Sequence, residues 1–151
     1  MLRTKNEIRD RAVIDDIIHR SLVCRLAMAD GLSPYVVPLC FDYDGKSLFF
    51  HCGAEGRKID ILKKNNRVCF EFDHTEGVEK GGRACSWGMT YQSVIGTGAA
   101  EFLADQQEKQ KVLARLFTKY SGETMPVPME NVQKTTVIQV TIEEITGKHS
   151  L

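Results

Sequence analysis

The chain has 151 residues, with 20 basic and 20 acidic side chains and therefore no formal net charge. This length is enough to bury one hydrophobic core, so we expect a single domain over residues 1–151. The balanced charge lacks the basic excess typical of proteins that bind nucleic acid or an anionic membrane. No apolar run is long enough to span a bilayer, and the N-terminal region lacks the hydrophobic segment of a signal peptide. We therefore expect a cytoplasmic protein.

The cysteines also favour a reducing compartment. There are five of them, no CxxC pair occurs, and most lie within strand-like runs. A reduced cysteine in such a run behaves as a small hydrophobic residue. The sequence therefore predicts neither a disulfide framework nor a metal site.

The first part of the chain predicts a helix followed by a strand. Between Asn6 and Ser21 apolar residues recur at helical spacing, while the opposite face carries arginine, aspartate and histidine. This pattern indicates one amphipathic helix that covers a barrel or a sheet. The run Val23–Ala29 alternates in polarity and stops at the turn dipeptide Asp30-Gly31, which indicates a strand.

Two further strands follow, and the first of them contains a proline. Tyr35–Phe41 has the composition of a strand, but Pro38 removes one hydrogen-bond donor and therefore belongs at a sheet edge or a bulge. A ligand can approach the backbone at such a position. Asp44-Gly45 then predicts a tight turn into Lys46–Cys52, so that these two strands form a hairpin.

The middle of the chain combines one clear strand with a long polar segment. Arg67–Asp73 places apolar residues on one face and polar residues on the other, as in a strand with one buried side. His74–Ala84 is polar and glycine-rich and predicts a mobile loop. Two extended segments follow, Cys85–Met89 and Tyr91–Leu103. Their glycines indicate bulges or close backbone approach: Gly88, Gly96 and Gly98.

The last third of the chain predicts a helix, an irregular connection and a regular strand. Asp105 and Glu108 form a capping-box pattern ahead of a helical apolar stripe that ends at Gly122. Residues 124–130 contain two prolines and predict an irregular connection. Thr135–Ile145 alternates regularly and is expected to be a strand.

These elements amount to about six or seven short strands with about three helices at the margins. Connections of the hairpin type outnumber crossover helices. We therefore expect a mainly β fold, a small antiparallel barrel with peripheral helices, rather than a doubly wound sheet.

One strand–turn–helix unit has the features of a phosphate site. Ser47–Cys52 is followed by a glycine-rich turn and then by a short helix that opens with Arg57 and Lys58. The N-terminal end of a helix carries partial positive charge and unpaired N–H groups, so two cations there oppose the macrodipole unless an anion binds among them. The unit is therefore a candidate phosphate cradle. A solvated first turn, with its repulsion softened by Asp60, is the alternative.

A few other polar side chains could act on a ligand bound there. His51 and Cys52 are adjacent on a strand, so their side chains point to opposite faces and cannot form a nucleophile pair. His51 either lies near whatever the cradle binds or is packed in the mouth of the barrel. Ser93 could donate a hydrogen bond to a phosphate oxygen. Lys148 could reach a ligand or a partner subunit, although a lysine near a terminus is usually solvated.

Several segments share the pattern of one family: Pro34–Leu39, Leu48–His51, Glu55–Lys58, Asn66–Phe70, Tyr91–Gly98 and Ile145–Lys148. Together they resemble the pyridoxamine 5′-phosphate oxidase-like flavin-binding split barrels, and most closely the nitroimidazole-resistance (nitroimidazole reductase) branch. The resemblance covers nearly the whole chain. It implies a split barrel and a homodimer that holds FMN in a groove between its subunits.

The resemblance also implies roles for individual residues. Arg57 and Lys58 match the positions that hold the FMN phosphate. The backbone along the isoalloxazine ring corresponds to Val37, Pro38 and Leu39. His51 matches a position close to the flavin and on the substrate side, which makes it the candidate catalytic residue. The remaining cofactor-binding candidates are Ser93, on the phosphate or ribityl chain, and Lys148.

One departure from the family bears on the reaction. Val37 stands where the true oxidases carry an arginine, and the chain has no equivalent of their C-terminal substrate-binding segment. We therefore do not expect oxidation of pyridoxine phosphate. The resemblance implies instead an FMN-dependent oxidoreductase that reduces a small electron-poor acceptor, such as a nitroaromatic, nitroimidazole or quinone, with electrons from NAD(P)H.

Other functions remain open at this point. The chain could bind or store flavin without turnover, or it could hold haem or another tetrapyrrole in the same groove. A plain interaction domain is a further alternative, and it would be colourless.

Overall fold

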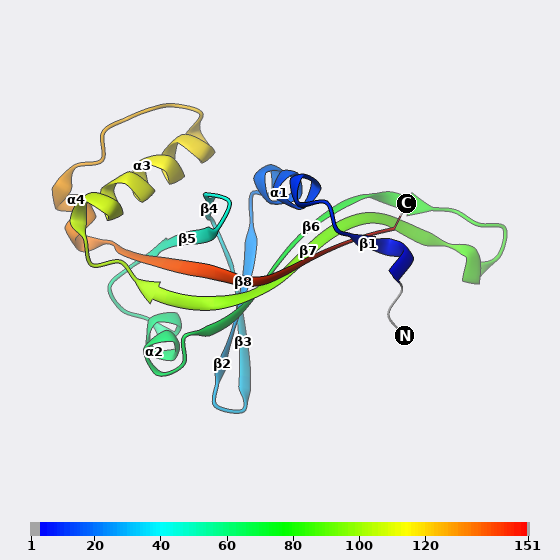
Figure 1. Ribbon diagram of the computed structural model, residues 1–151, viewed down its shortest axis with the longest axis horizontal. Coiled ribbons are helices and arrows are strands. Elements are labelled where there is room, and N and C mark those ends of the chain that lie inside the picture. Colours follow the sequence, from blue (N-terminus) through cyan, green and yellow to red (C-terminus); the bar gives the residue numbers. More distant parts are fainter. Residues whose placement is uncertain (1–3, 151) are drawn as a thin grey trace.

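The computed structural model describes residues 4–150. Within this range the chain forms eight β-strands, four α-helices and two short 3₁₀ turns, Thr4–Asn6 and Ala84–Ser86. The strands are β1 (Glu7–Ile8), β2 (Cys24–Asp30), β3 (Ser33–Leu39), β4 (Asp42–Tyr43), β5 (Ser47–Cys52), β6 (Arg67–Glu79), β7 (Gly88–Phe102) and β8 (Thr136–Ser150). The α-helices are α1 (Arg11–Arg20), α2 (Arg57–Lys64), α3 (Gln106–Ser121) and α4 (Met129–Lys134) (Figure 1).

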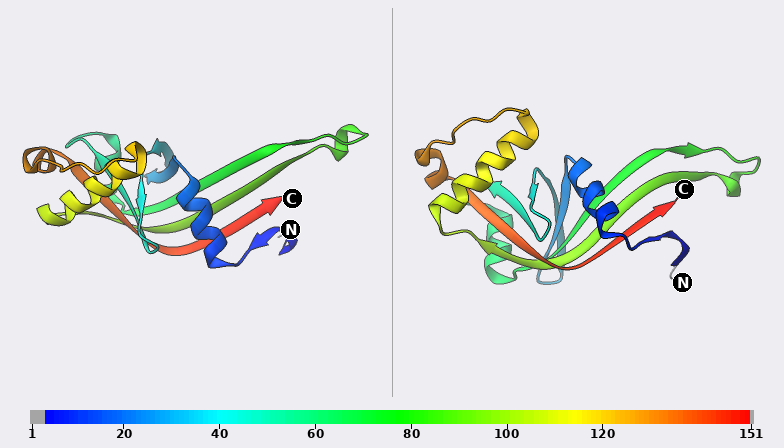
Figure 2. Two further views of the ribbon diagram at one scale, coloured as in Figure 1. Left: turned by 90° about the horizontal axis from the view of Figure 1, so that it is seen from above. Right: turned by 45° about the horizontal axis from the view of Figure 1, so that its top comes forward.

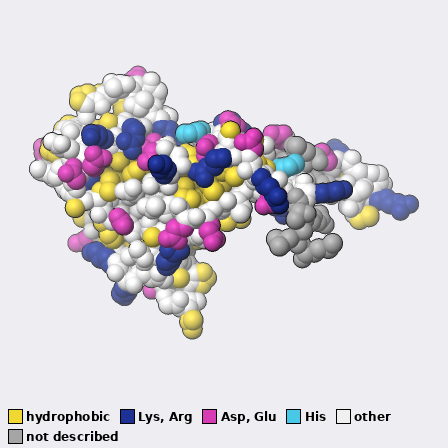
Figure 3. All heavy atoms as spheres, viewed as in Figure 1, with side chains coloured by type: hydrophobic (Ala, Val, Ile, Leu, Met, Phe, Trp, Pro, Cys, Tyr) yellow, Lys and Arg dark blue, Asp and Glu magenta, His cyan; other side chains and the backbone are white. Residues whose placement is uncertain are grey.

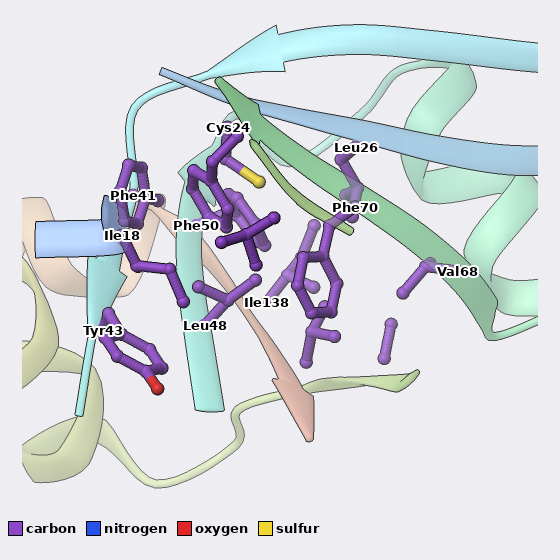
Figure 4. Close-up of a cluster of buried hydrophobic side chains, with 14 of the residues drawn as sticks. Ile18, Cys24, Leu26, Phe41, Tyr43, Leu48, Phe50, Val68, Phe70 and Ile138 are labelled. Atoms are coloured by element: carbon purple, nitrogen blue, oxygen red, sulfur yellow. The ribbon is translucent and has the colours of Figure 1, made fainter. Parts of the chain in front are cut away.

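The described strands form one antiparallel sheet in the order β3-β2-β6-β7-β8-β5-β4, and β1 pairs with β8 outside this path. Leu26 of β2 and Phe50 of β5 lie far apart in this order, yet both are fully buried in one hydrophobic cluster (Figure 4). The sheet therefore curls around a common core and leaves β3 and β4 as its two ends. The predicted mainly β, antiparallel split barrel is confirmed.

The structure has more strands than the six or seven that were expected. The reason is that β1 and β4 have only two residues each, too few for an alternation of polarity to show in the sequence. The hairpin predicted between the Pro38 strand and β5 is wrong. β3 pairs with β2, whereas β5 pairs with β4 and β8. Phe41 is fully buried and carries the chain from β3 into the core, so the Asp44-Gly45 turn joins β4 to β5.

The helix predicted from Asn6 begins instead at Arg11. The Asp10 carboxylate accepts a hydrogen bond from the Ala12 backbone N–H at 2.9 Å and so caps the first turn. The residues ahead of this cap form β1, which pairs with the last part of β8. Within α1 the apolar face covers the core: Ile14, Ile17 and Ile18.

β6 and β7 form a long hairpin that extends beyond the body of the molecule, as Figures 1 and 2 show. The mobile loop predicted over His74–Ala84 is wrong in its first half, because β6 continues to Glu79 and stays paired with β7 as far as Gly88. β8 also runs past Ile145 and remains beside β7 up to Ser150. Pairing between backbone groups, which side-chain polarity does not reveal, makes β6 and β8 longer than expected.

The region after β7 contains both predicted and unpredicted helix. The Asp105 carboxylate accepts a hydrogen bond from the Glu108 N–H at 2.9 Å, and α3 ends at Gly122 with a φ of 73°, as the capping pattern indicated. Residues 124–130, expected to be irregular, include the start of α4 at Met129. This helix has six residues and is too short to show a helical period.

β5 separates two hydrophobic clusters. Phe50 lies in the main core together with Phe70 (Figure 4). Phe49 points to the other face and packs against Val112 and Leu116 of α3. Because burying a large apolar side chain contributes about 1.5–3 kcal/mol, these contacts hold α3 over the outer face of β5.

Acidic and basic side chains are interspersed over the face drawn in Figure 3. Several of them pair across strands: Arg25 Nη1 lies 3.0 Å from the Glu71 carboxylate and 2.5 Å from that of Asp73. Hydrophobic atoms protrude at the β2–β3 turn, where Leu32 is fully exposed. None of the helices within residues 4–150 is long and apolar enough to cross a membrane.

The glycines of β7 differ in their surroundings. A Cβ atom at Gly96 would clash with the Phe70 ring and lie 2.6 Å from the Glu144 carbonyl oxygen. Gly98 sits at a bulge, where a Cβ atom would clash with the Thr141 carbonyl oxygen. Close backbone approach is confirmed at these two positions. It is wrong at Gly88, which has open space around it.

Gly96→Ala should therefore lower the free energy of unfolding by about 1–3 kcal/mol, because the Phe70 ring and the β8 backbone must shift to admit the methyl group. Gly88→Ala, in the same strand but in open space, should change it by less than about 0.5 kcal/mol. Urea denaturation of the two variants measures the difference. Equal losses would contradict the close approach at Gly96.

Candidate functional site

The strand predicted to lie along a cofactor is an edge of the sheet. β3 pairs only with β2 among the described strands, so one row of its backbone N–H and C=O groups has no strand partner there. Pro38 lies opposite Arg25, and its edge position agrees with its missing donor. Val37 and Leu39 pack against the core, so the exposed Pro38 between them points outward.

The first turn of α2 brings two cations and free backbone donors together. Arg57 and Lys58 open the helix, and the hydrogen bond that closes its first turn runs from Asp60 N to Gly56 O. The N–H groups ahead of Asp60 therefore have no helical acceptor. Gly56 provides no capping side chain, and its φ of 142° is a backbone conformation that other residues rarely adopt.

Arg57 reaches the β2–β3 hairpin. Its guanidinium carbon lies 4.4 Å from the centre of the Tyr35 ring, and Nη2 lies 3.6 Å from the Asp30 carboxylate. The side chains of this ion pair are 54% and 43% exposed, so the pair contributes at most about 1 kcal/mol to stability. An anion that binds at the start of α2 could displace Asp30 at little cost.

Lys58 is partly buried and lies near Cys52, the last residue of β5. Burial raises the pKa of the Cys52 thiol, and the positive charge of Lys58 partly offsets this rise. Arg57 therefore contacts the β2–β3 hairpin, while Lys58 acts on β5 through its charge.

His51 marks the other end of the site. It points away from the core that Cys52 packs against, as adjacent residues of a strand must, so the two do not form a pair. His51 lines a cavity of about 280 Å³ beneath α3. Cys40, which directly follows β3, lines the same cavity.

β3 connects these two ends. Tyr35, near its start, contacts Arg57, and Cys40, just past its end, shares the cavity with His51. A strand extends about 16 Å from residue 35 to residue 40. A cationic helix start, an unpaired strand edge and an apolar cavity thus follow one another along the same strand.

Ser93 and Lys148 do not lie near the groups along β3. They lie opposite each other on β7 and β8, and Ser93 is also opposite Asp73 of β6. Asp30, which contacts Arg57, continues β2 beyond the residue paired with Val68. Measured along β6, the position level with Asp30 and the position level with Ser93 are about seven residues apart, which corresponds to about 20 Å.

Several side chains at the site escaped prediction, among them Tyr35, Cys40 and Phe117. Strand alternation could have placed Tyr35 on the face of Val37 and Cys40 on the opposite face. Phe117 belongs to the apolar stripe of α3, but nothing local in the sequence indicates which strand that helix covers.

Two larger cavities contain none of the predicted residues. One, of about 440 Å³, lies over β2, β6 and β7 beside the ion pair of Arg67 and Glu143. The other, of about 430 Å³, lies between α1 and α3 beside the ion pair of Arg115 and Asp42. No group of three or more His, Cys, Asp or Glu residues within the described chain is placed to hold a metal ion.

Comparisons with known proteins agree with this architecture. The profile of the family described as pyridoxamine 5′-phosphate oxidase matches residues 10–149. A candidate 5-nitroimidazole antibiotic resistance protein from Bacteroides thetaiotaomicron is 32% identical; the match covers 95% of this chain and 86% of that one, with a TM-score of 0.83. A search of curated proteins found no match.

Two more distant structures share the fold. The flavocytochrome Anf3 from Azotobacter vinelandii is 19% identical over 100% of this chain and 72% of its own, with a TM-score of 0.87. A FAD and heme binding protein from Mycobacterium smegmatis is 17% identical over 96% and 73%, also with a TM-score of 0.87.

The accessibility of the cavity can be tested through its thiol. Cys40 is exposed, whereas Cys24 is fully buried and burial raises the pKa of its thiol. Iodoacetamide at pH 8 should therefore alkylate Cys40 in the native protein while Cys24 reacts only after unfolding in urea. The exposed Cys85 is the positive control, and peptide mass spectrometry reads out each site. Equal rates at Cys24 and Cys40 would contradict this arrangement.

Proposed function

Because the chain belongs to the pyridoxamine 5′-phosphate oxidase family, we propose that it is an FMN-dependent oxidoreductase. It reduces a small electron-poor acceptor, such as a nitroaromatic, nitroimidazole or quinone, with electrons from NAD(P)H. The observation that carries this proposal is the line of groups along β3, from the cations of α2 to the cavity at His51. Its span of about 16 Å is comparable to the length of an extended flavin mononucleotide.

In this proposal the start of α2 holds the phosphate. Arg57 and Lys58 supply charge, and the N–H groups of the first turn supply donors without other helical partners. The phosphate replaces Asp30 as the partner of Arg57, and the two cations then no longer oppose the helix dipole.

The unpaired edge of β3 provides a place for the flavin ring. Val37, Pro38 and Leu39 present backbone groups along this edge, and Pro38 keeps another strand from pairing there. Bound FMN supplies the electron transfer, while the protein sets its binding, orientation and local polarity.

His51 acts on the acceptor. Its ring lines the apolar cavity, where it can donate a hydrogen bond or a proton to an acceptor oxygen. The 32% identity with the Bacteroides thetaiotaomicron protein supports a nitroimidazole or related nitro compound as the acceptor class.

A homodimer completes the site. Ser93 and Lys148 lie about 20 Å from the level of Asp30 along the strands of one chain, which is too far for one phosphate to contact both places. A second copy, placed by two-fold symmetry, can supply them to the FMN that Arg57 and Lys58 hold.

The visible spectrum of the freshly purified protein tests the cofactor. We expect flavin absorption bands, release of FMN on denaturation, and oxidation of NAD(P)H that depends on an added nitro compound. A Soret band without flavin bands would support the haem alternative instead. A tightly bound flavin with no NAD(P)H oxidation would support a flavin-binding protein without turnover.

Arg57→Ala combined with Lys58→Ala should weaken FMN binding by at least about 100-fold, because two charge-assisted contacts of about 1.5–3 kcal/mol each are lost. Isothermal titration with FMN measures the change. The matched control removes Lys63 and Lys64, two cations at the other end of α2, and should leave the affinity within about 3-fold of wild type. Equal losses in the two double variants would contradict the phosphate assignment.

A mixed dimer tests the shared site. Neither the Arg57→Ala, Lys58→Ala chain nor the Lys148→Ala, Ser93→Ala chain should bind FMN tightly alone. If each site combines residues from two copies, a heterodimer of the two variants contains one intact site, so the purified heterodimer should bind flavin at about half of its sites. No recovery in a verified heterodimer would show that each chain binds FMN with its own residues.

A further inference from the structure

The cavity beside His51 has an unusually uniform lining. α3 contributes Leu113, Leu116, Phe117 and Tyr120, β5 contributes His51, and Cys40 follows directly after β3. The Tyr120 hydroxyl is directed elsewhere, since it accepts a hydrogen bond from the Phe41 N–H at 3.0 Å and donates one to the Leu22 carbonyl at 2.8 Å. The ring of Tyr120 therefore adds apolar surface and no free polar group.

The cationic side chains of α3, among them Arg115 and Lys119, do not line this cavity. Arg115 Nε is 2.6 Å from the Asp42 carboxylate, on the side of the neighbouring cavity. Lys119 Nζ lies 3.2 Å from the centre of the Phe41 ring and 5.5 Å from that of the Tyr120 ring, but Lys119 itself does not line the cavity. Among residues 4–150, no acidic side chain and no lysine or arginine lines the cavity at His51.

The absence of lysine, arginine and acidic side chains from the lining that residues 4–150 form restricts which ligands can bind in this cavity. A carboxylate or phosphate that entered would lose part of its hydration and meet no lysine or arginine side chain among the described lining residues, which is unfavourable. A neutral aromatic ring would bury its surface against the four α3 side chains and could use His51 for one hydrogen bond. The volume of about 280 Å³ admits a molecule of one or two rings, and not a dinucleotide.

We propose that this cavity is the acceptor site and selects small, neutral, planar aromatic or heteroaromatic molecules, with Phe117 as the residue that determines specificity. The proposal rests on the proposed function, because it places the acceptor of that reaction. It goes further in excluding anionic acceptors and in assigning α3 as the wall that recognises the ring. NAD(P)H, which carries phosphates, must therefore meet the flavin outside this cavity.

Phe117 is well suited to a test because its side chain is 39% exposed, so its removal leaves the core intact. Phe102 of β7 is 37% exposed and does not line the cavity, which makes Phe102→Ala a matched control. Phe117→Tyr preserves an aromatic face at the same place.

The experiment compares nitrobenzene with 4-nitrobenzoate, which share a nitro-substituted ring and differ by one carboxylate. Ligand-observed NMR titration of the oxidised, FMN-loaded protein measures both dissociation constants without turnover. We expect nitrobenzene to bind at least about 10-fold more tightly than 4-nitrobenzoate. Phe117→Ala should weaken nitrobenzene binding by about 10-fold, and Phe102→Ala and Phe117→Tyr should leave it within about 3-fold of wild type.

Two results would overturn the proposal: equal affinity for the two compounds, or nitrobenzene binding that Phe117→Ala and Phe102→Ala change to the same extent. These results are separable from a failure of the proposed function. If the protein holds no FMN, the proposed function fails, and the same titration on the flavin-free protein still decides whether the cavity selects neutral rings. If the protein reduces nitrobenzene but the titration shows no role for Phe117, the proposed function stands and the acceptor binds elsewhere.

Discussion

The burial of Phe50 is the constraint on which the geometry of the site depends. With Phe50 held in the barrel core, alternation along β5 directs Phe49 and His51 to the outer face. Phe49 then anchors α3 through Val112 and Leu116, so the helix lies over the same face to which His51 points. The packing that stabilises the barrel therefore also builds the cavity around the histidine. A shift of one residue in the β5 register would move His51 into the core and remove the site.

The positive charge at the start of α2 is only partly neutralised by the rest of the protein. Two cations next to the positive end of the helix dipole are unfavourable by themselves, and Asp30 compensates only in part across 3.6 Å of partly exposed space. The Tyr35 ring meanwhile keeps the guanidinium of Arg57 in place. Arg57 is thus positioned before a ligand arrives but weakly neutralised, which lowers the cost of ordering it when an anion binds.

Local patterns in the sequence were enough to locate the longer barrel strands and α2, although not their full extents or their pairing. The edge position of Pro38 and the opposite faces of His51 and Cys52 followed from backbone chemistry alone. Features that depend on pairing between distant strands could not be predicted from the sequence. The polar segment after Asp73 continues β6 because β7 satisfies its backbone, and Ser93 lies far from the start of α2 because the register of three strands sets its place. The position of α3 over β5 is likewise a long-range choice that no stretch of α3 encodes by itself.

The packing of β3 gives a physical reason for the departure at Val37. Its side chain is partly buried and packs against the core, on the face opposite to Pro38. An arginine at this position would have to place its charge among apolar side chains or shift the strand. The inward side of β3 therefore serves barrel stability in this chain, and only its edge and outward face are available to a ligand. At residue 37 no cation is present to bind an anionic substrate, in agreement with the absence of lysine, arginine and acidic residues from the described lining of the cavity at His51.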